Sequence, residues 1–143
     1  MIELAVDDLH LTYGDNPVLK GVSMNLKRGE VVSLLGPSGS GKTTLLRAVA
    51  GLEKPTQGSI VIGNNKVYDG TTRSEVPAEE RNLGLVFQSY ALWPHKTVFE
   101  NVAYPLKLRK VPAKEIQQRV QDVLDQLGLG HLGKRHPHQL SGG

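Results

Sequence analysis

The sequence predicts an α/β fold with strands in its first half and helices in its second half. Short segments with alternating apolar residues fill the beginning of the chain, which is typical of strands. A continuous apolar run at 31–35 leads directly into glycines and a helical pattern, as in a strand buried in a parallel sheet. After Gln88, apolar residues recur at helical spacing.

The strand segments come first along the chain and are separated by turn residues. GDNP at 14–17 and KRG at 27–29 are expected turns, and residues 63–80 form a polar, turn-rich connection. The expected strands are IELAV (2–6), LHLTY (9–13), VLKGVSMNL (18–26), VVSLL (31–35), SIVIG (59–63) and LGLVF (83–87).

Helical patterns follow the glycine-rich stretch and dominate the second half. KTTLLRAVA at 42–50 is expected to form a helix that stops at Gly51. Val98–Leu108 and Pro112–Leu127 predict two more helices, the second with proline in its first turn. We expect an apolar stripe on the last helix to pack against its neighbour: Ile116, Val120, Val123, Leu124 and Leu127.

Composition narrows the classes of protein to consider. The 143 residues are 38% hydrophobic and 22% charged with a net charge of +3, which indicates a soluble globular protein. Cysteine is absent, so a disulfide framework and a thiolate metal site are excluded. Early acidic residues argue against a secretory signal, and no apolar run reaches the roughly 18 residues of a membrane span. The basic clusters are short and lack interleaved aromatic residues, so we expect no nucleic-acid partner.

The motif GPSGSGKTT carries the main functional prediction. It consists of Gly36, Pro37, Ser38, Gly39, Ser40, Gly41, Lys42, Thr43 and Thr44. Such glycines allow backbone N–H groups to surround phosphate oxygens at the start of a helix. Lys42 supplies a positive charge for the β- and γ-phosphates, the Thr43 hydroxyl is suited to Mg²⁺, and Thr44 is suited to another phosphate oxygen. The alternatives are a turn without a ligand and a dinucleotide fingerprint; the Lys-Thr pair favours a phosphate-and-metal site.

Hydrolysis of a nucleotide also needs a carboxylate near the metal, and the sequence offers none in the expected position. No apolar strand ends in Asp or in Asp-Glu, and Asp69 follows only a short polar-flanked stretch. Gln88 follows the apolar segment 83–87. Its amide oxygen is suited to Mg²⁺ or to the attacking water, but it cannot act as a base.

With these motifs, the chain resembles the ATP-binding subunit of ABC transporters over its full length. Tyr13 matches the aromatic residue that stacks on adenine, and Gly36–Thr44 match the Walker A loop. Gln88 matches the glutamine loop, and Leu140–Gly143 match the first four residues of the LSGGQ signature. The resemblance implies a P-loop NTPase-type core with an antiparallel β subdomain at 1–87, and a glutamine loop with a helical subdomain at 88–143.

The resemblance also implies a function, with ATP and Mg²⁺ as cofactors. Thr43 and Gln88 would hold the metal, and Ser141, Gly142 and Gly143 would contact the γ-phosphate bound by a second subunit. The implied partners are membrane permease subunits, a second ATP-binding subunit and, indirectly, a substrate-binding protein. The location would be cytoplasmic, at the inner face of the membrane. The chain is most similar to the importers of iron(III), polyamines, sulfate and sugars. The segment LRAVAGLEKP at 46–55 also resembles amino-acid importers.

The sequence stops within the signature motif. The Walker B strand, the dimer loop and the switch histidine of the family are not in it, so we expect an amino-terminal fragment that does not hydrolyse ATP by itself. Two alternatives stay open, a soluble ABC protein acting on nucleic acid or ribosomes and a non-catalytic remnant.

Several residues have a second interpretation. Tyr13 and Gln88 are each also compatible with an ordinary place in or after a strand. Tyr90, Leu92 and Trp93 fit a small core and a groove for a permease helix equally well. We interpret His95, His131, His136 and His138 as surface or loop residues rather than metal ligands.

Overall fold

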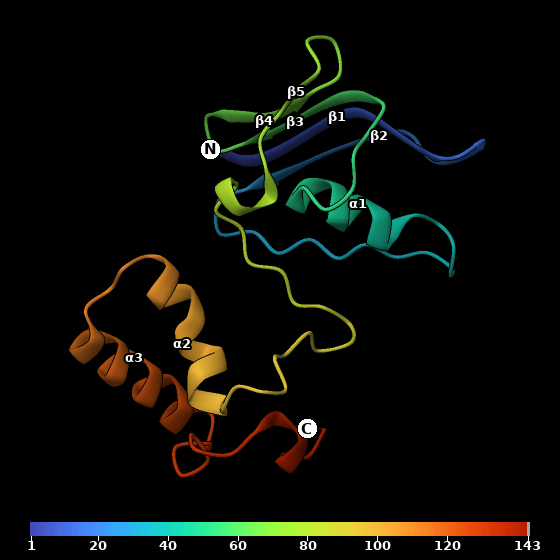
Figure 1. Ribbon diagram of the computed structural model, residues 1–143. Helices are drawn as coiled ribbons and strands as arrows, with labels where there is room; N and C mark the ends of the chain where they lie inside the picture. The colour runs from blue at the N-terminus through green and yellow to red at the C-terminus, as the bar shows by residue number, and fades with distance from the viewer. Residues whose placement is uncertain (143) are drawn as a thin grey trace. The chain divides into compact units, whose positions relative to one another are not determined.

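The computed structural model describes residues 1–142. They form two compact units, the first comprising Met1–Leu85 and the second beginning at Val86. The division predicted from the sequence lies between residues 87 and 88. The first unit holds the strands and one helix, and the second holds two helices (Figure 1).

The first unit is built on one sheet in which every pair of neighbouring strands is antiparallel. The strand order is β2-β1-β3-β4-β5. The strands are β1 (Ile2–Tyr13), β2 (Asn16–Lys27), β3 (Gln57–Ile62), β4 (Asn65–Asp69) and β5 (Ser74–Glu75).

A bulge makes one long strand of the first two expected segments. The register between β1 and β2 shifts between Val6 and Leu9, and Asp8 has a φ of 45°. Without an extra residue, Val6 and Leu9 would point to opposite faces of the sheet. The bulge lets both enter the same core, where their exposed fractions are 2% and 0%.

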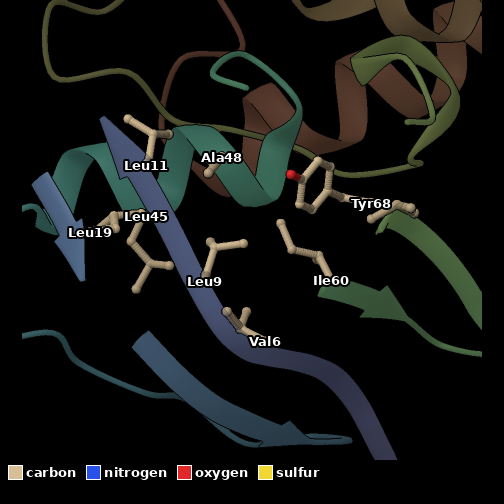
Figure 2. Packing of buried hydrophobic residues seen from close by; sticks show 9 residues of the cluster. Val6, Leu9, Leu11, Leu19, Leu45, Ala48, Ile60 and Tyr68 are labelled. Atoms are coloured by element: carbon tan, nitrogen blue, oxygen red, sulfur yellow. The ribbon is translucent and has the colours of Figure 1, made fainter. Parts of the chain in front are cut away.

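Helix α1 (Lys42–Ala50) covers this core. Leu45 and Ala48 lie on its buried side and pack with residues of β1, β2, β3 and β4 (Figure 2). Burial of each large side chain here stabilises the unit by roughly 1.5–3 kcal/mol. The helix ends at Gly51, whose φ of 86° permits its amide to bond back to the last turn. The predicted bounds of this helix are confirmed.

Two of the predicted strands are wrong. Residues 31–35 and 83–87 have no regular secondary structure and pair with no strand among the described residues, and the described sheet has no parallel pair. Val31, Leu35 and Val86 are more than nine-tenths exposed. A continuous apolar run becomes a buried strand only when neighbours supply hydrogen bonds on its edges and cover both faces. The described residues supply neither for these two segments.

Two further strands lie in the segment predicted to be a turn-rich connection. Residues 63–80 contain β4 and β5, followed by a short 3₁₀ turn at Ala78–Glu80. Val67 and Tyr68 of β4 are both 3% exposed. The signal was the Gly63-Asn64 pair, which links β3 to β4 as a two-residue hairpin turn does.

The second unit packs α2 (Val98–Leu108) against α3 (Ala113–Gln126) and ends with a 3₁₀ turn at Pro137–Gln139. Thr97 and Glu100 form a capping box at the start of α2, and Pro112 caps α3. Ile116, Val120 and Leu124 are buried as expected. Val123 and Leu127 are exposed, so that part of the predicted stripe is wrong. Within residues 1–142, no helix is both long and apolar enough to span a bilayer.

Candidate functional site

The loop Gly36–Gly41 forms an open turn that ends at the first residue of α1. The Ser40 amide donates to the Pro37 carbonyl at 3.2 Å, and the left-handed conformations of Gly39 (φ 82°) and Gly41 (φ 93°) turn the backbone. Gly41 is the helix cap and offers no side-chain acceptor to the first-turn amides, and no acidic residue lies in that turn. The helix start therefore presents N–H groups and a positive dipole end without an internal anion.

The ammonium group of Lys42 is held by oxygen atoms of this same loop. Its Nζ donates to the Gly36 carbonyl, to the Pro37 carbonyl at 2.9 Å and to Ser40 Oγ at 3.2 Å. These bonds place a full positive charge beside the turn. Thr43 is exposed in the next position of the helix, and Thr44 is half-buried. Loop amides, an ammonium and an accessible hydroxyl are together suited to bind a polyphosphate.

The loop is anchored to the sheet through Gly41. A methyl group placed on Gly41 would lie 3.0 Å from Leu19 Cδ2 and 3.2 Å from the Val18 carbonyl, so this backbone packs directly on β2. Gly39 has no atom within 4 Å of the same position. The tip of the loop is therefore open, and its end is fixed.

Tyr13 is the last residue of β1 and is 44% exposed. Leu11 pairs with Leu19, which contacts the end of the loop, and Tyr13 lies two residues beyond Leu11. Two strand residues span about 7 Å, so Tyr13 lies at the end of the hairpin that supports the loop. Tyr13 is not among the buried core residues of this unit. The alternative interpretation, in which Tyr13 is an ordinary core residue of a strand, is therefore not supported.

Gln88 lies in an exposed turn at the beginning of the second unit. Tyr90 and Ala91, just beyond it, have positive φ values of 66° and 53°, which are uncommon for residues with side chains. Tyr90 and Leu92 are 71% and 51% exposed. They therefore belong to the surface and not to a small core.

Ser141 and Gly142 are exposed and have no regular secondary structure. Gly143 lies outside the described residues. The His136 and His138 rings stack with centroids 6.0 Å apart. In the part of the chain that the structure describes, no three His, Cys, Asp or Glu residues are grouped as a metal site.

Comparison with known families identifies the family of the chain. Residues 19–143 match the family model described as ABC transporter. The chain belongs to the ABC transporter family. Its fold is the mixed α/β fold of the ABC ATPases, with the antiparallel sheet at the amino end and helices after it.

Among ABC transporter proteins, the trehalose/maltose import ATP-binding protein MalK of Thermococcus litoralis is 51% identical over 95% of this chain and 37% of its own length. The sn-glycerol-3-phosphate import ATP-binding protein UgpC of Bordetella avium is 49% identical over 100% of this chain and 38% of its own length. The chain thus spans less than two-fifths of these relatives.

A solved ATP-binding cassette, captured as a dimer after hydrolysis with ADP and Pi bound, has a similar fold. Its TM-score is 0.81 and its identity 33%, and the match covers 97% of this chain and 63% of the cassette.

The carboxylates of Asp69 and Glu100 are engaged in local structure of this ABC transporter chain. Asp69 accepts from Thr71 Oγ1 at 2.7 Å, from the Thr71 amide at 3.0 Å and from Lys66 Nζ at 3.1 Å. These hydrogen bonds, Thr71 first, lower the pKa of Asp69 to about 2. Glu100 accepts from Thr97 in the capping box, and this bond lowers its pKa.

Two residues that organise local structure within their own units are not predicted by the sequence pattern. Arg81 is the buried charged residue of the first unit, and Asn101 bonds to the turn before α2. The Asn101 oxygen accepts from the Trp93 amide, and its nitrogen donates to carbonyls of Trp93, Lys96 and Thr97. This turn holds Trp93 against Tyr104, with ring centroids 4.3 Å apart. Arg81 follows the 3₁₀ turn at Ala78–Glu80 and Asn101 is one polar residue of α2. A single polar residue leaves no periodic signal, so neither could be found from spacing.

Proposed function

We propose that this chain binds MgATP and is the ATP-binding, energy-coupling part of an ABC importer subunit. The observation that supports it most directly is the start of α1. Its glycine cap offers no side-chain acceptor to the first-turn amides, and the Lys42 ammonium lies beside the same loop. The relatives that match most of the chain carry import ATP-binding names, which favours an importer.

The loop residues fit a triphosphate. Its amides and the helix end would receive the β-phosphate, since both supply N–H donors to an anion. Lys42 already lies beside the Gly36 and Pro37 carbonyls and would exchange those bonds for β- and γ-phosphate oxygens. Thr44 would donate to another phosphate oxygen. Tyr13 would stack on adenine, because its exposed ring lies at the end of the hairpin that supports the loop.

The oxygen donors fit Mg²⁺, which neutralises phosphate charge when it is bound. The Thr43 hydroxyl is exposed at the helix start, and Gln88 is exposed in its turn. Both are neutral, hard oxygen ligands of the kind that Mg²⁺ accepts together with phosphates and water. Gln88 would orient water through its amide rather than remove a proton.

The partners follow from the importer assignment. Membrane permease subunits would carry out transport, and a second ATP-binding subunit would complete the nucleotide site. Ser141, Gly142 and Gly143 would contact the γ-phosphate held by that second subunit. A substrate-binding protein would act through the permease, and the protein would lie at the cytoplasmic face of the membrane. ATP hydrolysis coupled to uptake is the proposed activity of the whole protein.

Calorimetric titration of Lys42→Ala with MgATP tests the proposal. Loss of one charge-assisted bond to phosphate should weaken binding by roughly tenfold or more. Lys20→Ala serves as the matched control, because Lys20 is an exposed lysine of β2 in the same unit. Equal affinity of native chain and Lys42→Ala would contradict the assignment of the loop.

A further inference from the structure

Arg81 is 3% exposed and uses its guanidinium to join separate parts of the first unit. Its Nε donates to the Val76 carbonyl at 2.8 Å. One terminal nitrogen donates to the carbonyls of Ala48 at 2.9 Å and Val49 at 3.1 Å, and the other to the Val67 carbonyl at 3.5 Å. The side chain thus ties the last turn of α1 to β4 and to the segment after β5.

The charge and the planar shape of this group both matter. The last carbonyls of a helix carry the negative end of its dipole, which a buried cation balances. Burial lowers the pKa of Arg81, yet a guanidinium stays charged because its ordinary value lies far above neutrality. A lysine ammonium is a point donor and cannot span the same set of carbonyls.

The fit around Arg81 is close. A methyl group on Gly51, the residue that ends α1, would lie 2.8 Å from Arg81 Nε and 3.0 Å from the Ala78 Cα. Gly51 also has a φ of 86°. The chain therefore leaves the helix over the guanidinium, and the position of the arginine fixes the carboxyl end of α1.

The other end of α1 carries the phosphate-binding loop. The helix has nine residues, so about 13 Å separate its ends. A helix moves as a rod, because its backbone bonds connect each turn to the next. A tilt at Ala48 and Val49 consequently displaces Lys42 and the first-turn amides.

We propose that Arg81 is a positioning residue for the phosphate-binding loop, acting through α1 from the end opposite the loop. This role rests on the proposed nucleotide binding at Gly36–Thr44. Arg81 does not touch the phosphates in this assignment. It holds the helix in the orientation in which the loop amides and Lys42 meet them.

Native-state hydrogen exchange of the 143-residue chain provides a test that needs no nucleotide. The variants are Arg81→Gln and Arg81→Lys, and the matched control is Arg47→Gln. Arg47 lies in the last turn of α1 but is half-exposed, with its guanidinium 3.9 Å from Glu53. The reporter is the Leu45 amide, which bonds to the Gly41 carbonyl at the loop end. The Ile60 amide of β3 reports opening of the whole unit.

We expect Leu45 to exchange faster relative to Ile60 in Arg81→Gln, with a smaller change in Arg81→Lys and none in Arg47→Gln. The affinity of Arg81→Gln for MgATP should fall roughly tenfold, because displacement of the loop should cost about one charged hydrogen bond between the loop and the phosphates. Faster exchange confined to Gly51 and Leu52 would overturn the proposal, since Arg81 would then be only a local cap. Unfolding of both Arg81 variants would overturn it as well. Failure of the native chain to bind MgATP would refute the proposed function, while the exchange comparison would still decide the role of Arg81.

Discussion

Replacing Gly41 with alanine should damage the first unit more than replacing Gly39, although both glycines belong to the same loop. Gly41 and Gly39 have φ values of 93° and 82°, a region that costs a residue with a side chain about 1–2 kcal/mol. This conformational cost is common to both variants. The difference between them must come from what the new methyl group meets.

At Gly39 the methyl group meets no atom within 4 Å. At Gly41 it lies 3.0 Å from the buried Leu19 side chain and 3.2 Å from the Val18 carbonyl, and a strand carbonyl cannot move without disturbing β2. Overpacking of this kind costs roughly 1–3 kcal/mol. The free energy of unfolding should therefore fall by ~1–2 kcal/mol in Gly39→Ala and by ~2–5 kcal/mol in Gly41→Ala.

Exchange of the Ile60 amide in the folded protein measures these values, because this residue lies fully buried in the central part of the sheet. Affinity for MgATP should fall in Gly41→Ala even in the folded fraction, since the loop end must move away from β2. If both variants lost the same stability and affinity, the contact between Gly41 and β2 would be absent, and the loop would not be anchored there.

Three further predictions concern binding, pH and turnover. Tyr13→Ala should weaken the binding of MgATP several-fold, because about 1 kcal/mol of stacking is lost, and leave the binding of inorganic triphosphate unchanged. Equal losses of affinity for both ligands in calorimetry would refute the stacking role. Because the pKa of Asp69 is lowered from 3.8 to about 2, its contribution to stability should be nearly complete above about pH 4 and be lost as the pH falls through about 2. Asp69→Asn should then differ from the native chain in urea unfolding at pH 6, and differ much less at pH 2. Phosphate release by the 143-residue chain should equal that of Lys42→Ala, because Thr43 and Gln88 are neutral and cannot remove a proton from the attacking water. ATP turnover that is lost in Lys42→Ala would instead show that a carboxylate reaches the site.

The elements that depend on local chemistry could be predicted from the sequence. Helix α1 begins at Lys42 and stops at Gly51 as predicted, and α2 has the predicted bounds. Glycine at a helix end and apolar residues at helical spacing act within a few residues, so they leave a readable pattern. The motif GPSGSGKTT at 36–44 is equally local, because its glycines, lysine and threonines lie within nine consecutive residues.

Features that depend on distant partners required the tertiary structure. The runs at 31–35 and 83–87 have strong strand composition, yet a strand also needs an edge to pair with, and the described residues give them none. The bulge at Asp8 was hidden because strand patterns assume that side chains alternate without interruption.

The sequence by itself determined that a glycine-rich loop with a Lys-Thr pair precedes a helix, because these residues are adjacent in the chain. Only the tertiary structure decided how the helix is held. Arg81 reaches carbonyls of residues 48 and 49, more than thirty positions earlier, and Gly41 rests on β2. Such contacts arise when the chain folds back on itself, and no spacing along the sequence records them.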